Sequence, residues 1–84
     1  MIQFTLYSRG YCHLCDDMQA ALTLLLQDMP YQLTILDVDH DPVLLQQYDE
    51  LVPVLCAQKS PDAVQQQLCH YFLDSDKVKA FCNE

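Results

Sequence analysis

The spacing of apolar residues predicts two strands joined by a helix in the first part of the chain. Apolar and polar residues alternate over residues 2–7, which favours a strand, and a turn follows at residues 8–10. Apolar residues then recur at helical spacing and predict a helix over residues 13–28, which stops before Pro30. A second strand is predicted over residues 31–38. Because a helix joins the two strands, we expect them to be parallel.

The second part of the chain predicts two helices around a pair of strands. Asp41 can cap a helix over residues 42–50, and Pro42 has the fixed φ that suits a first turn. A strand is predicted over 53–57, a turn over 58–62, and a returning hairpin strand around 64–71. Asp74 is expected to cap a last helix. The predicted order is βαβαββα. The apolar faces of the three helices are formed by Leu14, Met18, Ala21, Leu22 and Leu25, by Leu44, Leu45, Tyr48 and Leu51, and by Val78, Phe81 and Cys82.

Composition indicates one packed domain over residues 1–84, because 51% of the residues are hydrophobic and there is only one glycine. The start lacks a basic segment typical of a leader peptide, and the longest apolar-rich run, 20–26, is too short to span a membrane. We therefore expect a soluble, cytoplasmic and monomeric protein. Twelve acidic residues against four basic ones, a net charge of −8, disfavour nucleic acid and anionic membranes as partners. The acidic runs at 37–41 and 74–76 are explained by helix capping.

Two cysteines at the mouth of the first predicted helix carry the candidate chemistry. Cys12 and Cys15 are close enough in sequence to form a small disulfide ring, and the free N–H groups of a first helical turn favour a thiolate. Thiolate is the reactive form of cysteine. Gly10 lies in the preceding turn, where we expect a positive φ to let the backbone reverse from strand into helix. The pattern predicts thiol–disulfide chemistry.

Two other interpretations of the cysteine pair stay open. Half of a structural zinc site has the same spacing, but none of the other cysteines or histidines forms a second pair with ligand spacing, so no metal site is predicted. The pair could also be buried as small hydrophobic residues. That is the interpretation we favour for Cys56, Cys69 and Cys82, which lie on predicted apolar faces. Because the cysteine count is odd, the reduced state is the default expectation for a chain without a leader peptide.

Three segments together resemble the glutaredoxin-like form of the thioredoxin fold. They are residues 7–15 with the cysteine pair, residues 36–39 at the end of a strand, and Val52-Pro53-Val54-Leu55. The resemblance covers essentially the whole chain and is strongest to small bacterial glutaredoxin-like proteins. It implies an α/β domain with a four-stranded mixed sheet flanked by helices. It also implies a thiol–disulfide oxidoreductase with no resident cofactor, acting on protein or small-molecule disulfides.

The same resemblance assigns roles to individual residues. Cys12 corresponds to the attacking thiol, Cys15 to the resolving thiol, and Pro53 to a cis-proline whose loop lies against the site. Arg9 corresponds to a basic residue near the carboxylate of glutathione. The further residues expected to contact substrate are Tyr11, His13 and Val52.

Charges beside the pair act in opposite directions. A protonated His13 would lower the pKa of the Cys12 thiol, although an exposed side chain that points into solvent is an equal alternative. Asp16 and Asp17 favour the helix N-terminus but would raise the pKa of the thiol. The sequence does not decide which effect is larger.

One part of the glutaredoxin pattern is missing. Glutaredoxins usually have a Gly-Gly pair after the fourth strand, whereas this region reads Leu68-Cys69-His70-Tyr71-Phe72. Side chains at Cys69 and His70 are expected to fill the space into which glutathione would fit. We therefore expect poor use of glutathione and at least equal use of a thioredoxin-type reductant.

The alternatives from other classes are an iron–sulfur or metal-binding module and a thioredoxin-fold binding domain. Substrate, reductant and reduction potential are not determined by the sequence.

Overall fold

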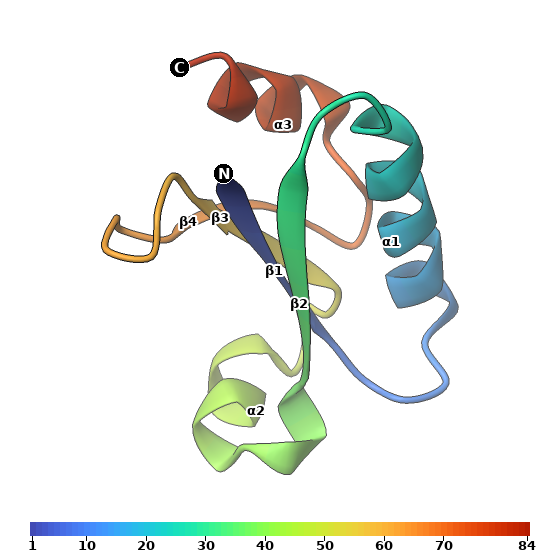
Figure 1. Ribbon diagram of the computed structural model, residues 1–84. Coiled ribbons are helices and arrows are strands. Elements are labelled where there is room, and N and C mark those ends of the chain that lie inside the picture. Colours follow the sequence, from blue (N-terminus) through green and yellow to red (C-terminus); the bar gives the residue numbers. More distant parts are fainter.

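The computed structural model describes all residues, 1–84, as a four-stranded sheet with helices on both faces (Figure 1). The order of the strands in the sheet is β2-β1-β3-β4. β1 and β2 are parallel, and β1 with β3 and β3 with β4 are antiparallel, so the expected mixed sheet and the parallel first pair are confirmed. The elements are β1 Ile2–Ser8, α1 His13–Leu25, β2 Tyr31–Asp37, a 3-10 turn Val38–His40, α2 Pro42–Tyr48, β3 Val54–Gln58, β4 Gln66–His70 and α3 Ser75–Cys82.

The element order is as predicted, but several boundaries differ. Helix α1 ends at Leu25 rather than at residue 28, and α2 ends at Tyr48 rather than at residue 50. The second strand ends one residue early because Asp37 turns the chain: its side chain accepts the N–H of Asp39 at 2.9 Å, which starts a 3-10 turn that the sequence pattern did not predict. The third strand begins at Val54, after the proline.

Capping fixes where the helices begin. The Asp41 carboxylate accepts the N–H of Val43 at 2.9 Å and that of Leu44 at 3.4 Å, and Pro42 occupies the first turn of α2. The Asp74 carboxylate accepts the N–H of Lys77 at 3.1 Å at the start of α3. Both predicted caps are confirmed.

Alternate residues of the strands face two separate cores. Phe4 and Leu6 of β1 belong to the larger core, with α1 and α3, whereas Tyr7 belongs to the smaller core under α2. Of the expected helix faces, Met18, Leu22, Val78 and Phe81 are buried, but Leu14 is exposed. No helix is both long enough and apolar enough to span a membrane. The sheet thus places α1 and α2 on opposite faces, with the turn before α1 between them.

Candidate redox site

The strand register places four connecting segments at the same end of the sheet, where β1, β2 and β4 end and β3 begins. The last residue of β1, Ser8, pairs with Asp37 at the end of β2. Tyr7 pairs with Val54, the first residue of β3, and Val54 pairs with His70, the last residue of β4. The cysteine turn, the start of α2, the proline before β3 and the loop after β4 therefore all leave the sheet at this end, which we call the motif end.

The cysteine pair forms the start of α1. Cys12 is the N-cap residue, and its sulfur accepts the N–H of Cys15 at 3.1 Å. The two residues form a disulfide with Cα atoms 5.2 Å apart. Cys12 is partly exposed, whereas Cys15 is 4% exposed and lies one turn further into the helix. This arrangement places a partly exposed cysteine at the helix N-terminus, with its sulfur at the Cys15 N–H, and a buried cysteine one turn further in.

The turn before the pair is built differently from the expectation. Gly10 does not have a positive φ, and a Cβ added to it would meet nothing within 4 Å. The left-handed residue is Tyr11, with φ of 55°, and its side chain is fully exposed. A non-glycine residue in this region costs on the order of 1 kcal/mol. The reversal from strand to helix is therefore made at Tyr11, next to the cysteine, and the prediction for Gly10 was wrong.

Arg9 is held by two carboxylates of the α2 region. Its guanidinium lies 3.2 Å from Asp39 and 2.7 Å from Asp49. The hydrogen bond to Asp49 has the largest effect and raises the pKa of the arginine; desolvation, the next largest, lowers it, and the attraction of the two carboxylates adds to the rise. The ion pairs tie the cysteine turn to both ends of α2. A ligand carboxylate at Arg9 would have to compete with these two partners.

The proline before β3 joins the same region. The Val52–Pro53 peptide bond is cis, as expected from the resemblance. The carbonyl of Pro53 accepts the N–H of Tyr71 at 2.9 Å, and the Tyr71 hydroxyl donates to the carbonyl of Glu50. These two bonds fasten the loop after β4 to the segment that precedes β3.

Two aromatic residues stand where the resemblance would place glycines. Cys69 is 9% exposed and belongs to the larger core, so it does not fill this space as expected, whereas His70 is exposed. The exposed residues that follow β4 are Tyr71 and Phe72, 41% and 69% exposed. Tyr71 has a φ of 64°, a conformation that glycine adopts most easily. The missing glycines were the only sequence signal for this aromatic pair.

The charged neighbours of the cysteines are all exposed. His13, Asp16 and Asp17 lie in the first residues of α1, with their side chains in solvent. Among the other expected contact residues, Val52 is partly buried and packs against the smaller core. The motif end therefore combines an accessible disulfide, exposed aromatic rings and carboxylates.

The remaining cysteines lie away from this site. Cys56 is 2% exposed, and burial raises the pKa of its thiol to about 11, against a smaller opposing effect of the Tyr48 hydroxyl. Burial likewise raises the pKa of Tyr48 to about 12 and raises the pKa values of Cys69 and Cys82. Core packing is confirmed for Cys56 and Cys69, while Cys82 is partly exposed.

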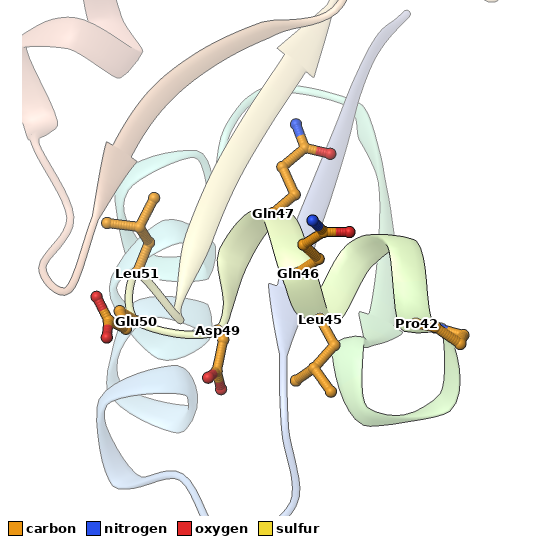
Figure 2. A pocket seen from close by; sticks show the side chains of 7 residues that line it. All are labelled: Pro42, Leu45, Gln46, Gln47, Asp49, Glu50 and Leu51. Atoms are coloured by element: carbon orange, nitrogen blue, oxygen red, sulfur yellow. The ribbon is translucent and has the colours of Figure 1, made fainter.

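The largest open depression is beside the site but not part of it. It has a volume of about 570 Å³ and is lined only by α2 and the following turn, between Pro42 and Leu51 (Figure 2). None of its lining residues belongs to the cysteine turn. No group of three or more His, Cys, Asp or Glu side chains is arranged to hold a metal ion.

Comparison with known proteins finds one matching family and similar solved structures. The family model described as "Glutaredoxin-like domain (DUF836)" matches residues 3–83. A protein from Nitrosomonas europaea, solved by NMR in solution, is 36% identical, with a TM-score of 0.81 over 95% of this chain and 89% of that chain. A protein from X. campestris, solved by X-ray methods, is 25% identical, with a TM-score of 0.61 over 95% of each chain.

More distant structures share the fold. Mitochondrial thioredoxin 3 from Saccharomyces cerevisiae, in its oxidised form, is 18% identical, with a TM-score of 0.69 over 98% of this chain and 76% of that chain. At this identity the likeness shows the thioredoxin fold alone. No curated protein matches the chain significantly.

Proposed function

The chain belongs to the glutaredoxin-like (DUF836) family, and from this premise we propose that it is a thiol–disulfide oxidoreductase whose redox couple is Cys12 and Cys15. The observation that carries the proposal is the disulfide at the start of α1, formed by partly exposed Cys12 and buried Cys15. A helix N-terminus stabilises the thiolate that must form when the bond is reduced.

The reaction begins at Cys12 of the reduced protein. Its thiolate attacks one sulfur of a substrate disulfide, so that a Cys12–substrate disulfide forms and the other substrate sulfur leaves as a thiolate, which takes up a proton. The N–H of Cys15, which points at the Cys12 sulfur at 3.1 Å, is positioned to stabilise the attacking thiolate.

Cys15 completes the reaction. Its thiol loses a proton and attacks the Cys12 sulfur, which releases the second substrate sulfur and forms the Cys12–Cys15 disulfide. The substrate has gained two electrons and two protons, and the protein has lost them. Because Cys15 is buried, its sulfur is positioned to attack Cys12 rather than a second substrate molecule. This favours release of the reduced substrate from the Cys12–substrate disulfide.

Three features favour a polypeptide disulfide over glutathione as substrate. Arg9 is already paired with two carboxylates. Tyr71 and Phe72 occupy the place of the glycines that allow glutathione close to the backbone, and their exposed rings offer apolar contact. The net charge of −8 weakly repels an anionic tripeptide. A thioredoxin-type reductant would then regenerate the dithiol at least as well as glutathione.

Parallel turnover assays test the proposal. One assay follows a peptide disulfide with thioredoxin and its reductase, and the other follows a glutathione mixed disulfide with glutathione reductase. We expect turnover in the first assay and at least about tenfold lower kcat/KM in the second. A glutathione-dependent kcat/KM of ~10⁴ M⁻¹s⁻¹ or more would contradict the substrate choice. No turnover in either assay would contradict the proposed function itself.

A further inference from the structure

Charge is divided unevenly between the two ends of the sheet. Six exposed acidic residues lie at the motif end: Asp16 and Asp17 on α1, and Asp39, Asp41, Asp49 and Glu50 before and after α2. Arg9 is the only basic residue there, and both of its ion pairs are with members of this set. We call the six residues the acidic rim.

The three lysines lie at the opposite end. Lys59 follows β3, and its ammonium contacts the carbonyl of Phe81 and lies over the ring of the same residue. Lys77 and Lys79 are on α3. In Figure 1, α3 is at the top of the molecule, whereas α2 and the turn before α1 are at the bottom. The motif end thus carries six exposed carboxylates against one basic residue and has a net negative charge.

Four members of the acidic rim, Asp16, Asp17, Asp41 and Glu50, form no ion pair within the protein. Asp39 and Asp49 pair with Arg9, and Asp41 caps α2. The carboxylates of Asp16, Asp17 and Glu50 take part in no ion pair. Asp16 directly follows Cys15 in sequence, and the Glu50 carbonyl accepts the Tyr71 hydroxyl (Figure 2 shows the Glu50 side chain). Unpaired carboxylates are therefore present both in the first turn of α1, next to the cysteines in sequence, and after α2 at the same end of the sheet.

We propose that the acidic rim makes this oxidoreductase selective for disulfides carried by cationic polypeptide segments. The inference rests on the proposed function, because the site is the Cys12–Cys15 couple and the rim sets which substrates reach it. Complementary charge of this kind raises association rates by roughly 10 to 10³-fold, and like charge lowers them. Exposed Tyr11, Leu14 and Phe72 supply apolar contact once a segment has arrived.

A single-turnover experiment with three peptides tests the selectivity. The peptides have one length and one intramolecular disulfide, flanked by lysine, glutamine or glutamate. The protein is reduced with dithiothreitol, which is then removed. Each turnover oxidises Cys12 and Cys15 and reduces one peptide, with transfer of two electrons and two protons. We expect the lysine peptide to react about tenfold or more faster than the glutamate peptide at low salt, and nearly equally at ~1 M salt.

Two triple variants of equal charge change test whether the selectivity for cationic peptides comes from the acidic rim. Asp16→Asn, Asp17→Asn and Glu50→Gln are combined in one variant, and Asp28→Asn, Asp62→Asn and Asp76→Asn in the control. All six residues are exposed, and both variants change the charge equally. The ratio of rates for the lysine and glutamate peptides should fall at least about threefold in the first variant and stay unchanged in the control. This ratio cancels any change in the intrinsic reactivity of Cys12.

The outcomes separate this inference from the proposed function. Equal reduction of all three peptides at low salt would overturn the selectivity and leave the oxidoreductase intact. An equal fall of the ratio in both variants would also overturn it, because total charge would then matter rather than the rim. If no peptide oxidises the Cys12–Cys15 pair, the proposed function fails, and the selectivity fails with it.

Discussion

Cys12 begins α1 and is partly exposed, whereas Cys56 lies within β3 and is 2% exposed. The Cys12 sulfur accepts a helix N–H, an environment that favours negative charge. At Cys56 burial disfavours charge and raises the pKa of the thiol to about 11. From this difference we expect the place of a cysteine in the fold, and not the number of cysteines, to decide which thiols react.

The largest expected effect comes from removing the thiols of the couple. Cys12→Ser should lower peptide-disulfide reduction by at least about 10³-fold, because the attacking atom is lost. Cys15→Ser should instead accumulate a disulfide between Cys12 and the substrate, visible by mass spectrometry. Cys56→Ala is the control and should retain activity. An inactive Cys56→Ala variant together with an active Cys12→Ser variant would contradict the assignment of Cys12 as the attacking thiol.

The next effect is on stability at alkaline pH. A cysteine in an unfolded chain loses its proton above about pH 8.5, whereas folded Cys56 keeps it up to about pH 11. Its contribution to stability is therefore complete below about pH 8.5 and is lost as the pH rises. This loss should be up to about 2 kcal/mol between about pH 8.5 and 10.

Urea unfolding at several pH values measures this loss, and the Cys56→Ala variant should lack much of it. Cys82→Ala is the matched control, because Cys82 is only partly buried. An identical pH dependence of the free energy of unfolding in Cys56→Ala and wild type would show that the Cys56 thiol is not shielded from ionisation.

A third change tests the aromatic pair of the motif end. Replacing Tyr71 and Phe72 together by glycine should raise glutathione-dependent turnover by about tenfold, because the space above the backbone is opened. The exposed residue Val64, changed to glycine, lies in the segment between β3 and β4 and serves as control. Unchanged turnover in a folded double variant would show that the aromatic pair does not exclude glutathione.

The smallest expected effect concerns Arg9. Its two ion pairs are exposed to solvent, and such pairs contribute little to stability. Arg9→Lys keeps the charge but loses the guanidinium nitrogen Nη2 that contacts both Asp39 and Asp49, so a slight fall in the thermal midpoint is expected, and it should shrink at high salt. A large loss of glutathione turnover in this variant would show that Arg9 binds substrate after all.

Most of the fold could be predicted because local signals agree with each other. Alternation in β1, helical spacing in α1, and the caps Asp41 and Asp74 each indicate one structure, and all of them are present in the fold. Boundaries were less predictable. Residues 26–28 have helical composition, and Leu26 is still buried in the larger core, but the backbone leaves the helix after Leu25 and turns, with the Met29 N–H donating to the Leu26 carbonyl.

The site was only partly predictable. The cysteine pair follows from a motif of adjacent residues, and the cis-proline was implied by the resemblance to glutaredoxins. The partners of Arg9 follow from neither, because Asp39 and Asp49 are 30 and 40 residues away along the chain. The positive φ at Tyr11 contradicts the preference for glycine and depends on how strand and helix are joined. Such features arise from tertiary structure, which local sequence patterns do not encode.

The most direct test of the central claim is an equilibrium redox titration of the wild-type protein, with mass mapping of every alkylated cysteine. We predict one two-electron transition, in which Cys12 and Cys15 gain or lose label together while Cys56 and Cys69 remain in the thiol state throughout. A transition that involves other cysteines, or none at Cys12 and Cys15, would contradict the account.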